Sequence, residues 1–184
     1  MNIKEFLVVI PARAGSKRIK NKNRVLFNNK PLIVQSIEYA KKNIGADIVI
    51  NTNDKLISPI AEQYGLEIIW REEHLAQDQS STLDMLKDVV EKVSKKYKYV
   101  VLLQPTNPLR PKNLFKECLD LLSKNQDQSV ITVGKNKEKF YYDLKKICNK
   151  NSESLLNIVL SSDNFGYVYN FKGIIGNGSC GSIM

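Results

Sequence analysis

The chain alternates between short apolar runs and longer segments with helical spacing. Residues 5–12 (EFLVVIPA) are almost continuously apolar, which predicts a strand buried on both faces. Further runs of this kind follow at 47–52, 66–70, 99–104, 129–133 and 165–171. Strands of this character, separated by helices, are typical of a sheet with helices on both sides. The pattern predicts an α/β fold with a doubly wound, mostly parallel sheet, Rossmann-like in its winding.

The segments between these runs repeat apolar residues every three or four positions. Pro31 is expected to open the first helix, and Asp54 and Ser81 are expected to cap the next two. The third helix is predicted to bury a face made of Leu83, Leu86, Val90, Val93 and Tyr97. A fourth helix is expected to begin near Leu114.

Three polar loops follow predicted strands, at 13–30, 71–82 and 104–112. Parallel sheets of this type bind ligands beyond the carboxyl ends of their strands. These loops are therefore the expected place of the functional site.

Composition narrows the class of protein. With 184 residues, of which 42% are hydrophobic and 26% charged, the chain is expected to form a single domain over 1–184. It has no apolar run of membrane-spanning length and no pattern typical of a signal peptide, which predicts a cytoplasmic protein without membrane contact. The three cysteines match no zinc or disulfide spacing and are expected to be reduced thiols.

The net charge of +9 has three interpretations. Nucleic-acid binding is disfavoured, because the lysines are scattered and no motif interleaves aromatic with basic residues. An anionic small substrate would be attracted by this charge. A lysine-rich composition without functional meaning is the third interpretation, and composition does not choose between the last two.

The most distinctive segment is PARAGSKRIKNKN at 11–23. Its turn of small residues, 14–16, allows backbone N–H groups to approach a ligand closely. Five cations surround that turn: Arg13, Lys17, Arg18, Lys20 and Lys22. Backbone donors and cations together predict a loop that binds a triphosphate, although a solvated basic loop would look similar. The spacing does not fit a Walker A loop.

Three motifs in order resemble the acylneuraminate cytidylyltransferase (CMP-N-acetylneuraminic acid synthetase) family. The first is IPARAGSKRIKNKN at 10–23, followed by KPLIVQSIEYA. The second is REEHLAQD at 71–78, followed by QSSTLD, and the third is LLQPTNPLR at 102–110. The resemblance covers about residues 5–134 well and 135–184 poorly. It implies a nucleotide-diphospho-sugar transferase fold.

The resemblance also implies roles on the nucleotide side. Lys22 would stabilise charge on the α-phosphate, with Arg13 as the second catalytic residue. Asn23 would contact the ribose or base, and Arg71 would help to recognise cytosine. The nucleotide-binding positions implied in this way are Ala12, Arg13, Ser16, Lys17, Asn23, Arg71, Ser81 and Thr82.

On the sugar side the resemblance implies Gln104, Pro105, Thr106 and Arg110. Gln104 stands where related sugar nucleotidyltransferases have an acidic metal ligand, and an amide suits a hydrogen bond better than a metal bond. Arg110 would face the carboxylate of the sugar, or it would be a surface cation beside a helix. Mg²⁺ is the implied cofactor, without assigned ligands.

The implied reaction transfers CMP from CTP to the anomeric hydroxyl of a sialic-acid-like nonulosonic acid, an acidic nine-carbon sugar, and releases pyrophosphate. Two alternatives are a catalytically silent CTP-binding remnant and a nucleotidyltransferase for another nucleotide and sugar. No nucleic-acid partner is expected. A homodimer is possible, because the family packs an insert across a dimer interface.

The C-terminal part departs from the family pattern. NFGYVYNF at 164–171 loosely resembles the N-G-A-I-Y strand of the family, whose metal-binding aspartates lie beyond that strand. Here Asp163 is the last carboxylate side chain. A shortened or divergent region 135–184, with weak catalysis or none, is therefore expected.

Overall fold

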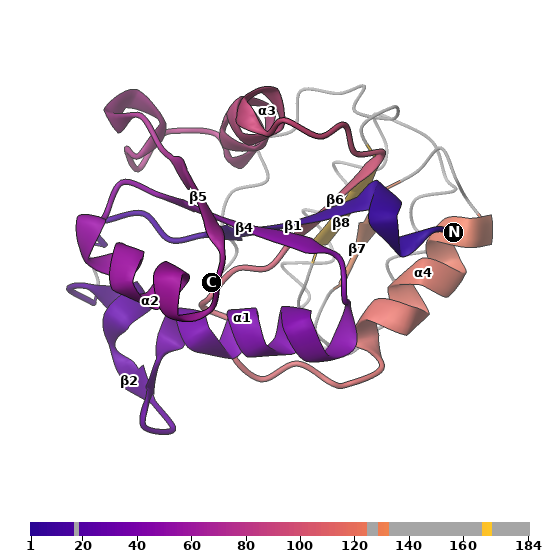
Figure 1. Ribbon diagram of the computed structural model, residues 1–184, viewed down its shortest axis with the longest axis horizontal. Helices are drawn as coiled ribbons and strands as arrows, with labels where there is room; N and C mark the ends of the chain where they lie inside the picture. The colour runs from indigo at the N-terminus through magenta and orange to yellow at the C-terminus, as the bar shows by residue number, and fades with distance from the viewer. Residues whose placement is uncertain (17–18, 125–128, 133–166, 171–184) are drawn as a thin grey trace, which may run out of the picture.

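The apolar runs form the strands of a six-stranded sheet, ordered β5-β4-β1-β6-β8-β7 (Figure 1). The computed structural model describes residues 1–16, 19–124, 129–132 and 167–170. Its strands are β1 (Phe6–Pro11), β4 (Asp47–Thr52), β5 (Glu67–Trp70), β6 (Tyr99–Leu102), β7 (Val130–Ile131) and β8 (Tyr167–Asn170). The expectation of a doubly wound, mostly parallel sheet is confirmed.

The sheet is parallel over β5, β4, β1 and β6. Strand β8 is antiparallel to both β6 and β7, so the far side of the sheet is mixed. The chain first winds from β1 through β4 to β5 and then crosses to the other side of β1 to form β6. The direction of winding therefore reverses between β1 and β6.

The helices lie on both faces of this sheet. They are α1 (Leu32–Asn43), α2 (Ser58–Gln63), α3 (Thr82–Lys92) and α4 (Leu114–Lys124), with short 3-10 turns η1 (Ile3–Glu5), η2 (Lys22–Arg24), η3 (Lys55–Ile57) and η4 (Glu73–Leu75). In Figure 1, α3 lies on one side of the strands, and α1, α2 and α4 lie on the other. No helix in the described ranges is both long and apolar enough to cross a membrane.

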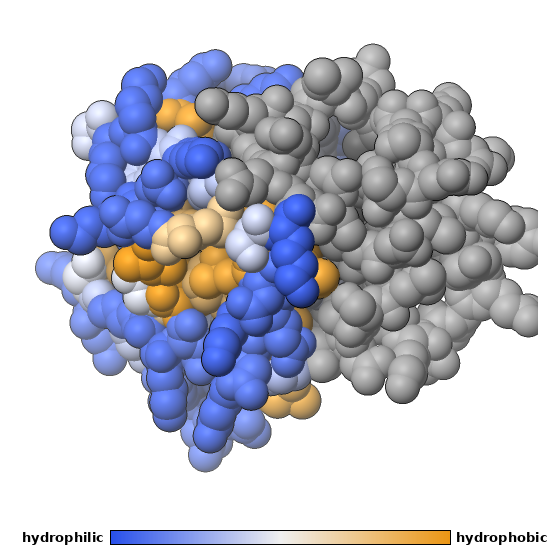
Figure 2. Space-filling model, turned by 90° about the vertical axis from the view of Figure 1, so that its right-hand side faces the viewer, coloured by the Kyte–Doolittle hydropathy of each residue, from blue (hydrophilic) through white to orange (hydrophobic). Residues whose placement is uncertain are grey.

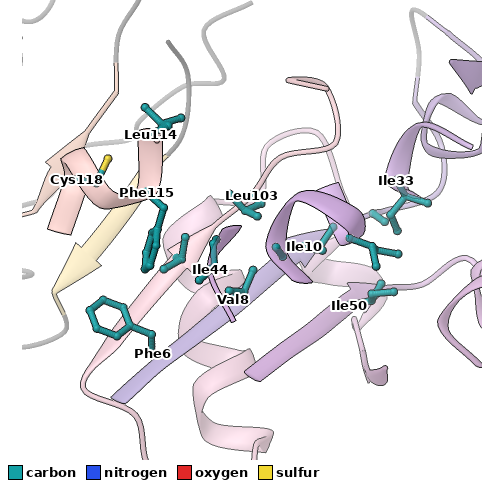
Figure 3. Close-up of a cluster of buried hydrophobic side chains, with 14 of the residues drawn as sticks. Phe6, Val8, Ile10, Ile33, Ile44, Ile50, Leu103, Leu114, Phe115 and Cys118 are labelled. Atoms are coloured by element: carbon teal, nitrogen blue, oxygen red, sulfur yellow. The ribbon is translucent and has the colours of Figure 1, made fainter. Parts of the chain in front are cut away.

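Alternating residues of the central strands supply the two halves of the core. One half packs the α1, α2 and α4 face against residues such as Phe6, Val8 and Ile10 (Figure 3). The other half packs α3 against the opposite side of the same strands, through residues such as Leu7 and Val9. Burial on both faces explains why the strands read as continuous apolar runs.

Cys118 belongs to the first half of this core, where it is a buried free thiol. Burial raises the pKa of Cys118 to about 11, so the thiol is protonated and unreactive at neutral pH. This agrees with the expected reduced cysteine, and the other two cysteines lie outside the described residues.

On the side of the molecule shown in Figure 2, a hydrophobic area lies among hydrophilic residues in the described part of the chain.

Two local expectations were wrong. The basic segment 13–30 was expected to be a loop throughout, but it contains a small hairpin, β2 (Leu26–Phe27) with β3 (Lys30–Pro31). The turn of this hairpin has Asn28 and Asn29 in the left-handed conformation that asparagine tolerates better than most residues. Pro31 is consequently the last residue of β3 and the N-cap of α1 rather than its first helical residue.

The third helix is also shorter than its apolar spacing predicts. Helix α3 ends at Lys92, and its buried residues are Met85, Leu86 and Val89. Tyr97 lies beyond the helix and donates a hydrogen bond of 2.8 Å to the carboxylate of Asp47, which orients it through tertiary contacts. Ser81 caps this helix as expected, because its Oγ accepts from the backbone N–H of Leu83 at 3.1 Å.

The core contains one polar atom whose removal is testable. The hydroxyl of Tyr99 is buried and has no hydrogen-bond partner among the described residues. Its ring stacks on Phe6 with 4.7 Å between ring centroids. We expect Tyr99→Phe to leave the free energy of unfolding in urea unchanged or to raise it by about 1 kcal/mol, because it removes an unsatisfied group.

The control is Leu122→Ala, which truncates a fully buried side chain and should cost about 2–5 kcal/mol. A clear loss of stability in Tyr99→Phe would mean that the hydroxyl has a partner in solution.

Candidate functional site

The reversal of winding between β1 and β6 predicts where a ligand binds. At such a point the loops after neighbouring strands diverge and leave a crevice at the carboxyl edge of the sheet. Here the segment after β1 turns toward β4 and β5, and the segment after β6 turns away under α1 (Figure 1). The first and third motifs lie in these two segments, and the second motif, at 71–78, follows β5.

Strand β4 holds the loop after β1 through its last two residues. The backbone N–H of Ala12 donates to the carbonyl of Asn51 at 2.9 Å. The hydroxyl of Thr52 donates to the carbonyl of Ala12 at 2.6 Å, and Thr52 is fully buried. The loop therefore leaves the sheet from a fixed point.

The next turn of the loop is bonded to the residue that follows β4. The side-chain oxygen of Asn53 accepts from the backbone N–H of Ala14 at 2.8 Å, and its amide nitrogen donates to Glu73 at 3.1 Å. Gly15 follows with a φ of 75°, in the left-handed region that suits glycine. Asn53 thus joins the loop after β1 to the loop after β5.

Arg13 makes a second connection between these two loops. Its guanidinium donates to the carbonyl of Ala76 at 2.8 Å and forms an ion pair with Asp78. The backbone carbonyl of Arg13 accepts from the side-chain amide of Asn23 at 3.1 Å, and Asn23 is buried. The first two sequence motifs are therefore in direct contact.

Arg71 lies at the bottom of the same region, one residue after β5. Only 9% of the residue is exposed. Its Nε donates to the side-chain oxygen of Asn51 at 2.5 Å, and Nη2 lies 3.3 Å from the backbone carbonyl of Asn51. Asn51 in turn donates through its amide nitrogen to the carbonyl of Ile69 at 3.0 Å, so its orientation is fixed from both sides.

The charge of Arg71 is poorly compensated. Burial, and to a smaller extent the positive charge of Arg13, lowers the pKa of Arg71 to about 10. The guanidinium is still charged at neutral pH, and in the described part of the chain no carboxylate lies within ion-pair distance of it. Two cations face the same region, and the more distant charge of Asp88 only partly offsets the effect of burial on Arg71, which favours binding of an anion.

The remaining nucleotide-side positions lie in the segments that follow β1 and β5. Lys22 is the first residue of η2, and Ser16 is half-buried in the loop after β1. Ser81 caps α3, and Thr82 is its first residue. Lys17 lies outside the described residues. Lys22, Ser16, Ser81 and Thr82 all follow β1 or β5, but their relation to a ligand stays a prediction.

The third motif, at 102–110, lies in the segment that follows β6. Pro105 is buried and Thr106 exposed, and the backbone carbonyl of Gln104 accepts from the N–H of Asn107 at 3.1 Å. The same carbonyl accepts from Arg110 at 2.5 Å. Arg110 is partly buried, and burial lowers the pKa of its guanidinium to about 10.

Asn51, Thr52 and Asn53 were missed by the sequence analysis. They form the end of DIVINTN at 47–53, which we assigned only as a strand and its exit. Three polar side chains directly after a buried run are unusual, and that contrast is the signal that could have revealed them. Their contacts explain why: each one holds a neighbouring strand or loop.

Carboxylates at this edge are already paired with nitrogen donors. Asp54 forms an ion pair with Arg24 at 3.0 Å, Asp78 pairs with Arg13, and Glu73 accepts from Asn53. Over the described ranges, no group of three or more histidine, cysteine, aspartate or glutamate side chains could hold a metal ion. These residues therefore do not by themselves fit a magnesium site.

Comparison with protein families agrees with this geometry. The model of the cytidylyltransferase family matches residues 7–171, which include all the strands of the sheet except the first residue of β1. The fold and the site place the chain among nucleotide-dependent transferases, and the chain belongs to the cytidylyltransferase family.

Individual relatives are identical to this chain at about a third of the aligned positions. CMP-N,N'-diacetyllegionaminic acid synthase of Legionella pneumophila is 33% identical over 174 residues, covering 83% of this chain and 75% of that protein. N-acylneuraminate cytidylyltransferase of Escherichia coli is 33% identical over 64% of this chain but only 28% of its own length. Pseudaminic acid cytidylyltransferase of Campylobacter jejuni is 35% identical, over 66% of this chain and 55% of its own length.

Solved structures support the fold. CMP:2-keto-3-deoxy-manno-octonic acid synthetase complexed with CTP has a TM-score of 0.59 at 22% identity, covering 69% of this chain and 51% of that one. A cytidylyltransferase from Leptospira borgpetersenii has a TM-score of 0.57 at 18% identity, covering 72% and 55%. At this level of identity the likeness extends to the nucleotidyltransferase fold alone.

The pairing of Asn51 with Arg71 gives a quantitative prediction. Asn51→Ala should lower the free energy of unfolding by about 1–3 kcal/mol, because it leaves a buried guanidinium without its acceptor. In an Arg71→Met background the same change should cost less, by a coupling energy of about 0.5–3 kcal/mol. Urea denaturation of the four proteins completes the cycle.

The control is Asn43→Ala, at the C-terminal end of α1. It also removes a hydrogen bond from a side-chain amide to a backbone carbonyl, that of Tyr39 at 3.0 Å. Its cost should be the same with or without Arg71. Equal costs for Asn51→Ala in the two backgrounds would show that the pair is not coupled.

Proposed function

We propose that this protein transfers CMP from CTP to the anomeric hydroxyl of a nonulosonic acid, releasing pyrophosphate. The observation that carries the proposal is the buried, uncompensated Arg71 beside Arg13, at the carboxyl edge of β1, β4 and β5. Membership of the cytidylyltransferase family supports the nucleotide, and the similarity to synthases for legionaminic and pseudaminic acid supports the sugar class.

On the nucleotide side, the loop after β1 is proposed to hold the triphosphate. Backbone groups of Ala12 to Ser16 and the side chains of Lys17 and Lys22 would contact phosphate oxygens. Arg13 would reach them on exchanging its partner Asp78 for phosphate. Lys22 and Arg13 are the proposed catalytic residues, because charge on the α-phosphate rises as pyrophosphate leaves.

The nucleoside is proposed to lie toward β5. Arg71 would contribute to cytosine recognition, with Ser81 and Thr82 beside it. Asn23 uses its amide nitrogen on the carbonyl of Arg13, which leaves its side-chain oxygen for the ribose or base. The tight anchoring of Asn51 supports a recognition role for Arg71, since a guanidinium fixed at two points loses little freedom on binding.

On the sugar side, Gln104, Pro105 and Thr106 are proposed to form the wall of the acceptor pocket. The anomeric oxygen would form its bond to the α-phosphorus as the bond from that phosphorus to pyrophosphate breaks, in line. The hydroxyl proton would pass to solvent water in the same step. Holding the two reactants in line accounts for much of the rate enhancement in such sites.

Mg²⁺ is proposed to accompany the triphosphate and would supply positive charge that offsets the phosphate charge. The described carboxylates at the site are engaged with Arg13, Arg24 and Asn53, so no protein ligand is assigned to the ion.

A single domain over 1–184 is part of the proposal, supported by β8, which joins the same sheet as β1. A cytoplasmic location and a homodimer are proposed with it.

The nucleotide preference is directly testable. We expect CTP to bind more tightly than ATP, GTP or UTP in isothermal titration calorimetry with Mg²⁺ present. Arg71→Met should reduce that preference, because it removes the fixed donor near the base. Lys42→Ala, at an exposed position near the far end of α1, is the control and should bind CTP as the parent protein does. Equal affinity for all four nucleotides would contradict the cytidine assignment.

Turnover is the second test. Pyrophosphate release should require CTP, Mg²⁺ and one acid from a panel of N,N'-diacetyllegionaminic, N-acetylneuraminic, pseudaminic and ketodeoxyoctonic acids. Lys22→Ala and Arg13→Ala should each lower the rate by about 10²–10³, the usual effect of losing one charge-stabilising donor. Binding of CTP without turnover on any acid would instead identify a silent CTP-binding protein.

A further inference from the structure

The loop after β6 is fastened to α1 by Arg110. Its Nη1 donates to the hydroxyl of Ser36 at 3.1 Å, and its Nη2 donates to the backbone carbonyl of Gln104 at 2.5 Å. Its guanidinium carbon lies 5.7 Å from the centre of the Tyr39 ring, within the range of a cation–π contact. One side chain therefore joins Gln104, the second residue after β6, to the middle of a core helix.

Helix α1 presents a matching pair of polar groups. Ser36 and Tyr39 are three positions apart and so lie on the same side of the helix. Ser36 is fully buried among apolar neighbours, and the hydroxyl of Tyr39 donates to the carbonyl of Pro111 at 3.1 Å. Both ends of the segment 104–111 are thus held by one turn of α1.

The surroundings of Arg110 argue against an ordinary surface role. Its Nε is buried and has no hydrogen-bond partner among the described residues. In those residues no carboxylate forms an ion pair with it. Burying a cation in this way costs free energy, so the contacts to Ser36 and Gln104 must matter for the arrangement of the loop.

The same geometry bears on direct contact with a substrate. Both terminal nitrogens already have protein acceptors, and the buried Nε closes the edge through which a guanidinium often binds a carboxylate side-on. An anion could approach only through the remaining hydrogens of Nη1 and Nη2.

We propose that Arg110 is a positioning residue that fixes Gln104 and the wall 104–110 for the acidic sugar, by anchoring them to Ser36 and Tyr39. The proposal rests on the function proposed above. Three prolines at 105, 108 and 111 stiffen the same segment, so one anchor near its end sets the whole wall. The nucleotide side, beyond β1, is held by other contacts and is independent of Arg110.

Four variants separate this role from its alternatives. Arg110→Met keeps the length of the side chain and removes its charge and donors. Arg110→Lys keeps the charge but lacks the planar fork that reaches two acceptors. Ser36→Ala removes one anchor from a residue that no substrate can reach. Lys112→Met is the matched control, because it removes an exposed positive charge two residues away.

Hydrogen exchange measured by mass spectrometry tests the anchoring without reference to activity. Arg110→Met and Ser36→Ala should speed exchange in peptides covering 103–110 and leave peptides covering 6–14 unchanged. Lys112→Met should exchange as the parent protein does. Parent-like exchange of 103–110 in Arg110→Met would overturn the proposal, whether or not the protein turns over substrate.

Kinetics test the consequence for the sugar. Arg110→Met and Arg110→Lys should raise KM for the acid that is turned over by about tenfold, the size expected for a lost hydrogen bond to a charged group. Their Kd for CTP should stay within about twofold of the parent value, and a general loss of structure would change both. Ser36→Ala should raise KM in the same direction.

Two results would overturn the positioning role. One is a raised KM in Arg110→Met with parent-like exchange and KM in Ser36→Ala, which indicates direct contact between Arg110 and the sugar. The other is the same effect from Lys112→Met, which indicates a general attraction by charge. If the parent protein turns over none of the acids in the panel, the proposed function fails, and the exchange experiment alone decides the anchoring.

Discussion

The site depends on the hydrogen bonds between Asn51 and Arg71. A guanidinium that is 9% exposed has to be satisfied by the fold, and Asn51 does this from the end of β4. The neutral amide of asparagine accepts the hydrogen bond and leaves the positive charge of Arg71 in place. An aspartate at this position would neutralise that charge. The arrangement therefore preserves a positive charge at the carboxyl edge of the sheet, on the side where we propose that the nucleoside lies.

The loops on the proposed nucleotide side and the segment on the proposed sugar side are fixed in different ways. On the nucleotide side, loops are bonded to one another through Arg13, Asn23 and Asn53, so that side is a network of polar contacts around β4. On the far side of β1, one residue, Arg110, and the neighbouring prolines fix the segment against α1. Separate anchoring would allow the proposed acceptor segment to change without disturbing the loops that would hold the nucleotide. Relatives of this chain are named for different sugars, legionaminic acid and pseudaminic acid.

Much of this could be predicted from the sequence, for physical reasons. Burial on both faces makes strands such as β1 and β6 continuous apolar runs, and the ligand edge follows from the winding of the chain. The hairpin β2–β3 was not predicted, because two-residue strands leave no period and their turn depends on the left-handed Asn28 and Asn29. The end of α3 at Lys92 and the roles of Asn51 and Asn53 depend on partners distant in sequence, which spacing along the chain does not contain.

The position of β8 has a consequence for how the molecule forms. Among the described strands, β7 pairs only with β8, and β8 pairs with β6 across a separation as large as Tyr99 to Asn170. During synthesis the parallel strands β1, β4, β5 and β6 can pair once residue 102 has left the ribosome. Strand β7 has no partner strand until β8, which ends at residue 170, has also left it. The edge of β6 stays open over that interval, which makes it the natural point for a chaperone to bind or for two nascent chains to associate.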